Sequence, residues 1–408
     1  MPEAIGIAED VPRIWIQKNY ASFNGIRGLA VTAVFFSHYL WIMPAAYLRA
    51  AGQYLSSGVD LFFVLSGFLI TGILYDSLDT QHYFKNFYIR RTLRIFPLFY
   101  AVYLFLFLLK PLLHLTPDPL VPSFLLYVGN LVEPFTKKIG PGMNYFYVMH
   151  HGKKVIVASM GHFWSLCVEE QFYLCWPAII WMVRDRRKLM KICLAGAGGA
   201  LFIRLAIEWF APHFVASTDV IYVSTYTRFD TLFVGSWMAL FLRGQALTRV
   251  QLRRASAWLF CLPLALLVLG MQVRLHVAHL HISRMLSYSF IALIALGLIL
   301  RSLDDTSRLS RLLRFSPLAR LGIVSYGFYV FHEIPNVFLS EIYDSRVQYF
   351  QSRSMLRIAI PLAIFAAAWL LAELSFRFYE TPFLRLKKKL APQRNNIHLD
   401  IAAASETI

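Results

Sequence analysis

The chain repeats long apolar segments, each close to the length that an α-helix needs to cross a lipid bilayer. About ten follow one another: 27–47, 58–75, 95–115, 163–183, 192–210, 222–243, 257–272, 286–302, 321–340 and 358–378. A helix needs about 20 mostly apolar residues to span the hydrocarbon core. Of the 408 residues, 58% are hydrophobic and 15% are charged, whereas soluble proteins carry about 25% charged residues. The sequence therefore predicts an all-α, polytopic transmembrane helix bundle with about ten spans.

The basic residues gather between these segments and predict the orientation of the bundle. They form five clusters: Arg90 to Arg94, Arg184 to Lys191, Arg243 to Arg254, Arg301 to Arg320 and Arg385 to Lys389. Basic loops of membrane proteins face the cytoplasm. All five clusters fall on one side if a shorter apolar stretch, 123–132, does not span. This arrangement predicts that both termini are cytoplasmic, and it explains the net charge of +17 without a nucleic-acid partner.

The predicted organisation is one transmembrane domain with short flanking segments. The domain covers 23–384, after a cytoplasmic N-terminal segment, 1–22, and before a basic, then polar cytoplasmic tail, 385–408. The connection 116–162 is long and rich in Pro, Gly and aromatic residues, so we expect it to be functional or re-entrant. The four cysteines lie in or beside apolar segments and are expected to be small hydrophobes, not disulfide partners or metal ligands.

Ionisable residues inside apolar segments are costly and therefore indicate function. Arg27 and His38 are eleven residues apart in the first segment. This spacing puts them on one helix face, about 16 Å apart along the axis. Because imidazole exchanges a proton near neutral pH, His38 is a candidate catalytic base. The alternatives are a histidine satisfied by a neighbouring helix and an arginine that reaches the membrane surface.

Two further pairs of charged residues are candidates for the same site. Arg91 and Arg94 share a helix face before the third segment. They either anchor the helix at the cytoplasmic surface or bind phosphate, which guanidinium groups match in geometry. Glu169 and Glu170 open the fourth segment. Either carboxylate can orient a catalytic imidazole or bind a substrate hydroxyl, and a salt bridge within the bundle is the alternative.

Other polar residues in the segments are expected to support the site or the fold. Asp60 is explained as an N-terminal helix cap, and Arg228 with Asp230 as a structural pair. His162 precedes the fourth segment, and His332-Glu333 lies in the ninth. None of these residues has a spacing that by itself defines a catalytic role.

Several sequence strings, in this order, resemble the membrane-bound acyltransferase-3 family, the O-acyltransferases of bacterial surface polysaccharides and some small molecules. The resemblance runs from about Phe23 to Pro382. The strings are Phe23-Asn-Gly-Ile-Arg-Gly-Leu-Ala, Ser57-Gly-Val-Asp-Leu-Phe-Phe-Val-Leu-Ser-Gly-Phe-Leu-Ile, Arg91-Thr-Leu-Arg-Ile-Phe-Pro, His162-Phe-Trp-Ser-Leu-Cys-Val-Glu-Glu-Gln-Phe-Tyr and Ser325-Tyr-Gly-Phe-Tyr-Val-Phe-His.

The resemblance implies roles for particular residues. The family's catalytic histidine falls on His38 and its arginine eleven residues earlier on Arg27, while its paired arginines fall on Arg91 and Arg94. Asn24 and Cys167 replace an Asp and a Ser that are common in the family, so neither is given a catalytic role. The fused extracytoplasmic hydrolase-like domain of some members is not expected here, so a second transfer step would use a separate extracytoplasmic partner protein.

The function expected from topology and resemblance is O-acyl transfer in the bacterial cell (inner) membrane. Cytosolic acyl-CoA, with acetyl as the expected acyl group, would place its phosphates against Arg27, Arg91 and Arg94. His38, with Glu169 or Glu170, would serve transfer to a hydroxyl of a carbohydrate acceptor, such as a surface polysaccharide or its lipid-linked precursor. No bound cofactor or metal is expected. The alternatives are a macrolide-like acceptor, a proton- or solute-coupled transporter and a non-catalytic scaffold.

Overall fold

The computed structural model describes residues 21–136, 144–245, 247–276 and 282–391, and most of this chain is helical. Most of the predicted N-terminal segment and the end of the predicted tail lie outside the described residues. The long helices are α1 (Ala21–Tyr39), α3 (Gly58–Asp76), α4 (Tyr83–Leu113), α7 (Trp164–Val183), α8 (Arg186–Phe210), α11 (Thr225–Leu242), α12 (Arg249–His276), α13 (Ile282–Leu303) and α19 (Ser354–Leu374). Within the described ranges, seven helices are long and apolar enough to cross a membrane.

Shorter elements connect and extend these helices. They are η2 (Leu40–Ile42), α2 (Ala46–Leu55), α5 (Val121–Leu125), α6 (Gly129–Val132), η3 (Glu133–Thr136), η4 (Gly161–Phe163), α9 (Pro212–Ser217), α10 (Val220–Val223), α14 (Arg308–Leu313), α15 (Ser316–Ile323), α16 (Ser325–His332), α17 (Asn336–Ser345), α18 (Val347–Gln351), the π-helical η5 (Ser375–Glu380) and α20 (Thr381–Leu390). The stretch 123–132 forms parts of α5 and α6, of 5 and 4 residues, neither of which is long enough to span.

Two predicted spans differ from the observed helices in a way that matters for the site. Helix α1 begins by Ala21 and ends at Tyr39, so His38 lies in its last turn and not in the middle of a 27–47 helix. The backbone becomes extended at Met43, and Pro44 follows. The predicted single helix 321–340 is wrong, because this segment is divided among α15, α16 and α17. Pro335, directly before α17, lacks the N–H that a continuous helix would need.

The all-α prediction missed a small sheet in the 116–162 connection. Strand β2 (Tyr145–His150) pairs antiparallel with β3 (Lys153–Ser159), and β1 (Thr116–Pro117) joins the other edge of β2. His151 and Gly152 form the two-residue turn with φ of 48° and 76°, the conformation that favours glycine in tight hairpins. The backbone N–H of Ile156 donates to Glu341 Oε1 at 3.1 Å and ties the hairpin to α17.

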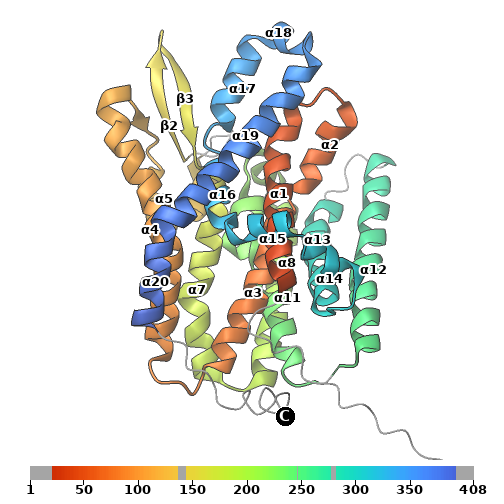
Figure 1. Ribbon diagram of the computed structural model, residues 1–408. Coiled ribbons are helices and arrows are strands. Elements are labelled where there is room, and N and C mark those ends of the chain that lie inside the picture. Colours follow the sequence, from red (N-terminus) through yellow and green to blue (C-terminus); the bar gives the residue numbers. More distant parts are fainter. Residues whose placement is uncertain (1–20, 137–143, 246, 277–281, 392–408) are drawn as a thin grey trace, which may run out of the picture.

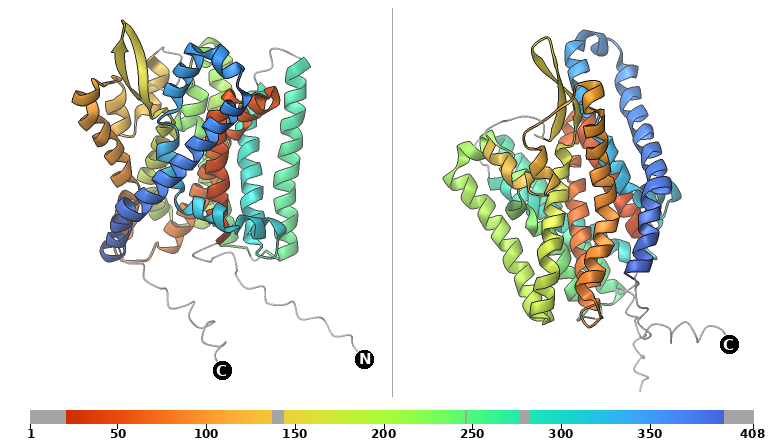
Figure 2. Two further views of the ribbon diagram at one scale, coloured as in Figure 1. Left: turned by 45° about the horizontal axis from the view of Figure 1, so that its top comes forward. Right: turned by 90° about the vertical axis from the view of Figure 1, so that its left-hand side faces the viewer.

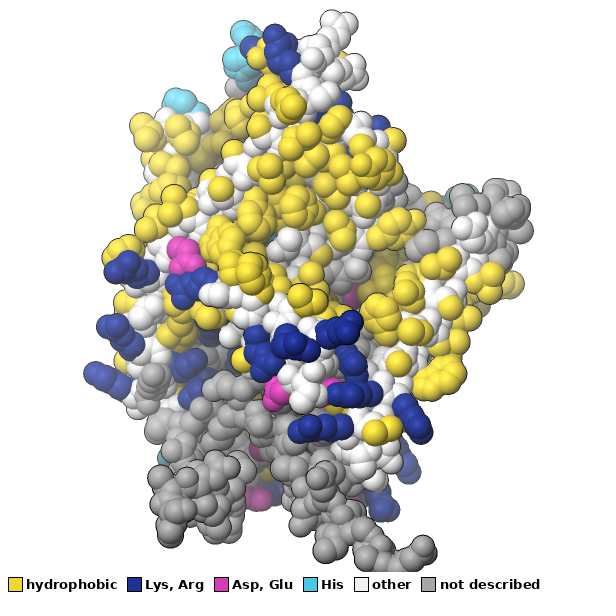
Figure 3. Space-filling view, turned by 45° about the vertical axis from the view of Figure 1, so that its right-hand side comes forward, with side chains coloured by type: hydrophobic (Ala, Val, Ile, Leu, Met, Phe, Trp, Pro, Cys, Tyr) yellow, Lys and Arg dark blue, Asp and Glu magenta, His cyan; other side chains and the backbone are white. Residues whose placement is uncertain are grey.

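The hairpin and the basic connections lie at opposite ends of the molecule. Figure 1 shows β2, β3 and α18 at the top, and the α3–α4 and α7–α8 connections at the bottom. Both views in Figure 2 keep the hairpin at the same end as α17 and the start of α19. On the face in Figure 3, apolar side chains cover the middle, and many Lys and Arg side chains gather below them. This distribution is the one expected of a polytopic membrane protein.

Helices α3 and α11 cross at the centre of the bundle so closely that only glycine fits at the contact. A Cβ atom on Gly67 would lie 2.0 Å from the carbonyl oxygen of Leu232, and one on Gly235 would lie 2.0 Å from that of Val64. Small residues at such crossings let helix backbones approach within a membrane. Ser66, one residue before Gly67 on α3, lines the cavity described below.

We expect Gly67→Ala to destabilise the protein, because the added methyl group forces α3 and α11 apart. Overpacking of this kind costs about 1–3 kcal/mol. The matched control is Gly198→Ala on α8, where an added Cβ meets nothing within 4 Å and alanine is favoured in a helix by about 0.5–1 kcal/mol. Thermal unfolding of detergent-solubilised protein measures both variants. Equal or higher stability of Gly67→Ala relative to Gly198→Ala would contradict this account of the crossing.

Candidate active site

A histidine and a glutamate from opposite ends of the sequence form the centre of the site. His38 Nδ1 donates to Oε2 of Glu333, which follows the last residue of α16. The other carboxylate oxygen, Oε1, accepts from Asn336 Nδ2 at 3.1 Å. The His38 side chain is 26% exposed and that of Glu333 is 10% exposed. Because an ionised carboxylate can only accept, this contact places a ring proton on Nδ1, and in the neutral imidazole Nε2 then carries the lone pair, on a ring that a substrate can reach.

The backbone around His38 is held by contacts from two other helices. The hydroxyl of Tyr39 donates to the carbonyl oxygen of His332 at 2.5 Å, which ties α1 to α16. Arg357 of α19 donates from Nε to the carbonyl of Ile42 at 2.7 Å and from Nη2 to that of Met43 at 2.8 Å. These bonds satisfy carbonyls that the end of α1 and the η2 turn leave free. His38 therefore sits on a fixed helix end.

Two more imidazole rings lie behind His38. The ring of His332 stacks on that of His38, with centroids 5.2 Å apart, and His162 lies 5.1 Å from His332. His332 is completely buried and His162 is 5% exposed. In the described part of the chain, both ring nitrogens of His162 lack a hydrogen-bond partner, and so does Nε2 of His332. The predicted supporting residues His162 and His332 are thus close to the predicted base.

A cavity of about 980 Å³ opens beside the α3–α4 connection and reaches toward these histidines. Its volume lies in the upper part of the range for small-molecule sites. Its basic lining residues are Arg27, Lys85, Arg90, Arg91, Arg94 and Lys387, and its acidic ones are Asp76 and Glu169. Asp76 is paired with Arg243, whose Nη2 lies 2.5 Å from Oδ2. The cavity is therefore strongly positive and suits an anionic ligand.

The predicted arginines converge on this cavity as expected. Arg27 donates to Asn24 Oδ1 at 3.0 Å. The guanidinium of Arg91 lies over the ring of Tyr173 at 4.9 Å. Among the described residues, Arg27, Arg91 and Arg94 make no ion pair within 4 Å, so their charges are available to a ligand. His38 does not line this cavity.

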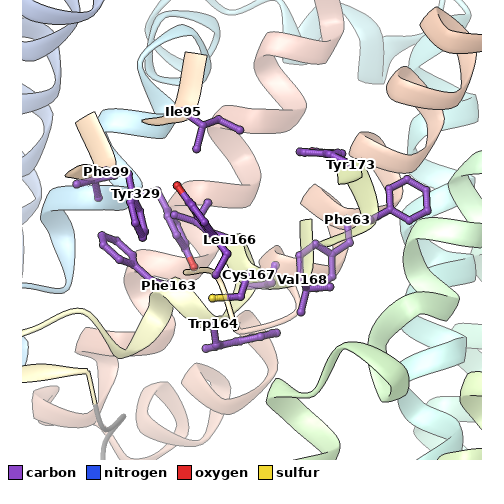
Figure 4. Close-up of a cluster of buried hydrophobic side chains, with 14 of the residues drawn as sticks. Phe63, Ile95, Phe99, Phe163, Trp164, Leu166, Cys167, Val168, Tyr173 and Tyr329 are labelled. Atoms are coloured by element: carbon purple, nitrogen blue, oxygen red, sulfur yellow. The ribbon is translucent and has the colours of Figure 1, made fainter. Parts of the chain in front are cut away.

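The inner end of the cavity carries two hydroxyl groups that contact the turn bearing His162. Ser165 Oγ and the hydroxyl of Tyr329 lie 2.6 Å apart. Tyr329 donates to the carbonyl oxygen of His162 at 2.6 Å, and both Ser165 and Tyr329 line the cavity. Figure 4 shows Tyr329 among the buried side chains of Phe163 and Leu166. The side chains of Ser165 and Tyr329 thus lie between the cavity and His162, the first of the three neighbouring histidines His162, His332 and His38.

Glu169 and Glu170 differ in position. Glu169 lines the cavity, where its Oε1 accepts from Ser66 Oγ at 2.5 Å. Glu170 does not line it, and its Oε1 has no partner among the described residues. The carboxylate that orients His38 is Glu333, so the structure does not support this role for Glu169 or Glu170. Glu333 was located in the ninth segment but was predicted to have no role of its own, although a carboxylate in an apolar segment was itself a signal.

Asp60, Arg228 and Asp230 belong to buried ion pairs between helices. Arg228 Nη2 donates to Asp60 Oδ1 at 2.6 Å, and Arg204 Nη2 donates to Asp230 Oδ2 at 2.7 Å. The predicted cap at Asp60 and the predicted Arg228–Asp230 pair are therefore wrong. Residues two apart on a helix do not face each other, and each buried charge instead has a partner on another helix. Arg204, which lies inside the apolar segment 192–210, was not among the residues predicted to form such pairs.

The chain is similar in sequence to a known family and to several named proteins. The family described as "Acyltransferase domain" matches residues 20–373. Peptidoglycan O-acetyltransferase OatA of Listeria monocytogenes is 29% identical over 385 residues, which cover 90% of this chain and 56% of that protein. O-acetyltransferase OatA of Staphylococcus aureus is 27% identical over 384 residues, which cover 88% of this chain and 56% of that protein. Putative peptidoglycan O-acetyltransferase YrhL of Bacillus subtilis is 29% identical over 385 residues, with 88% and 54% covered.

The chain thus spans about half the length of these relatives. No solved structure matches it. The family match covers most of the chain, including Arg27, His38 and Glu333. With its apolar helices and its paired imidazole and carboxylate, this chain belongs to the acyltransferase-3 family of membrane acyltransferases.

Proposed function

We propose that the protein transfers an acyl group, acetyl in the first instance, from acyl-CoA to a hydroxyl of a carbohydrate acceptor in the bacterial cell membrane. The observation that carries this proposal is the His38–Glu333 pair beside the closed end of a cavity lined with arginines. The relatives named O-acetyltransferase support the acetyl group. A surface polysaccharide or its lipid-linked precursor is the proposed acceptor, since two relatives carry peptidoglycan in their names.

His38 supplies the base in this scheme. Glu333 accepts from Nδ1 and thereby holds the ring in the tautomer whose Nε2 can take the proton of the acceptor hydroxyl. The hydroxyl oxygen then attacks the acyl carbonyl carbon, the C–S bond of the thioester breaks, and the proton on His38 passes to the leaving thiolate. The carboxylate stabilises the imidazolium that exists between these steps, as in other base–carboxylate pairs.

The cavity is the proposed donor site. The phosphates of acyl-CoA would pair with Arg27, Arg91 and Arg94, whose charges have no ion-pair partner among the described residues. Guanidinium groups bind phosphate with two parallel hydrogen bonds. The pantetheine arm would then run along the apolar wall toward Ser165 and Tyr329 at the inner end. An acyl group at this inner end would lie on the cavity side of His38, His162 and His332.

The scheme requires the α3–α4 end of the molecule to face the cytoplasm, where acyl-CoA is made. In this topology the protein has about ten spans with both termini cytoplasmic, and the β2–β3 hairpin lies outside. The acceptor would approach His38 from that outer side, which is where an envelope polysaccharide is found. A separate extracytoplasmic protein would complete any second transfer step.

We expect His38→Ala to lose transfer of label from acetyl-CoA by at least 10²-fold, because a positioned general base contributes about 10²–10⁴-fold. Glu333→Gln should lose a comparable factor. Its amide can donate to Nδ1, which moves the ring proton to Nε2 and removes the base. The measurement is turnover of labelled acetyl-CoA by the purified chain with an added carbohydrate acceptor.

Glu341→Gln is the matched control for this pair, because Glu341 lies on α17 and bonds to the hairpin instead of to His38. It should keep most of the activity. Full transfer by correctly folded His38→Ala would end the proposed mechanism.

We expect Arg91→Gln and Arg94→Gln to raise the KM for acetyl-CoA about tenfold or more, because each removes a charged hydrogen bond to phosphate of about 1.5–3 kcal/mol. The kcat should change much less. Arg377→Gln is the control, since Arg377 is exposed and does not line the cavity. Steady-state kinetics with varied acetyl-CoA measure the effect. An unchanged KM in both cavity variants would show that acyl-CoA does not bind at these arginines.

We expect the two ends of the molecule to differ in access from outside the cell. In a chain whose cysteines are replaced by alanine, Lys153→Cys in the hairpin should react with an impermeant maleimide in intact cells. Gln81→Cys in the α3–α4 connection should react only after the membrane is permeabilised. Both positions are exposed in the structure. The reverse pattern would place the cavity outside the cell, where cytosolic acyl-CoA cannot reach it, and would contradict the proposed donor.

A further inference from the structure

His38, His332 and Glu333 form a donor set that the proposed chemistry uses only in part. Each presents one ligand atom, and these atoms lie within 4.8 Å of one another. Two imidazole nitrogens and a carboxylate oxygen are a common set of zinc ligands. The acyl transfer described above uses His38 and Glu333 and gives no task to His332.

The orientation of His332 is the one that a metal ligand requires. Its Nδ1 lies 2.7 Å from the carbonyl oxygen of Tyr329, to which it donates, so that Nε2 carries the lone pair. His332 is fully buried, and Nε2 has no hydrogen-bond partner among the described residues. A buried acceptor without a partner is unfavourable. A backbone carbonyl behind one nitrogen is the usual support of a histidine that binds metal through the other.

The other donors are supported in the same way. Glu333 is held through Oε1 by Asn336, which leaves Oε2 directed at His38. Asn336 is itself fixed by Trp41, whose Nε1 donates to its Oδ1 at 3.3 Å. The buried ring of His162, 5.1 Å from that of His332, supplies a nearby third imidazole with both nitrogens unpaired in the described chain.

We propose that His38, His332 and Glu333 bind a divalent transition-metal ion, with Zn²⁺ as the fitting representative, and that this ion inhibits the enzyme. The ion takes the place of the proton between His38 and Glu333. The neutral imidazole then keeps its single proton on Nε2, so the ring has no lone pair left for the acceptor hydroxyl. No oxidation or reduction is involved. Metal binding itself does not depend on the proposed function, whereas the inhibition does.

Binding is tested on the full chain in detergent, with its affinity tag removed and its metal stripped by a chelator that is then dialysed away. Calorimetric titration with Zn²⁺ should show one ion per chain. His332→Gln should weaken binding at least tenfold. His213→Gln is the matched control, because His213 is exposed and lies on α9, away from the site. Equal Zn²⁺ affinity in these two variants, or no binding by the native chain, would overturn the proposal.

Two further measurements keep the proposal falsifiable if His332→Gln does not fold. Co²⁺ bound to the native chain should give the visible absorption of a low-coordinate site with imidazole ligands, and its absence would refute the site. Zn²⁺ should inhibit acetyl transfer by the native chain and by His213→Gln at the same concentration. If His38→Ala retains transfer while the native chain binds Zn²⁺, the proposed function fails and the metal site stands.

Discussion

The hydrogen bond between His38 and Glu333 is the interaction on which the rest of the site depends. It joins residues 295 positions apart in the chain. One stands in the last turn of the first long helix, and the other follows the short helix α16. An imidazole alone at this depth would have neither a fixed tautomer nor a partner for its positive form. The carboxylate supplies both, because it accepts from one nitrogen and compensates charge on the ring.

The broken ninth segment carries the carboxylate of this bond. A continuous helix over 321–340 would engage the N–H and C=O groups around Glu333 in its own ladder. The interruption instead leaves Glu333 as the cap of α16, and Pro335 separates it from α17. Irregular backbone inside a membrane domain is tolerated where protein or a cavity covers it. Here the hydroxyl of Tyr39 donates to the carbonyl oxygen of His332 and so satisfies one backbone acceptor at the interruption.

Hydropathy and charge predicted the elements well, but not their long-range partners. Apolar segments of about 20 residues located most of the long helices, and the predicted sharing of one site by Arg27, Arg91 and Arg94 agrees with the cavity that all three line. Local rules see only near neighbours in the chain, and Asp60 finds Arg228 at a separation of 168 residues. The sequence also did not rank the acids in the apolar segments, so Glu169 or Glu170 was the expected partner of His38 instead of Glu333. The hairpin was missed although Gly152 follows His151 between two runs of strand-forming residues.

The separation between the arginine-lined cavity and His38 is a physical consequence of what each must contact. The phosphates of a donor need unpaired guanidinium groups at a wet entrance, where they can be paired without burying net charge. The base needs Glu333 to fix its tautomer, and its ring, which is 26% exposed, must also be reachable by an acceptor. Ser165 and Tyr329 line the cavity and contact the carbonyl oxygen of His162, whose ring lies edge-to-face with that of His332, and His332 in turn stacks on His38. In the proposed scheme the acyl group would pass these side chains to reach His38, whereas the charged part of its carrier would remain at the arginines.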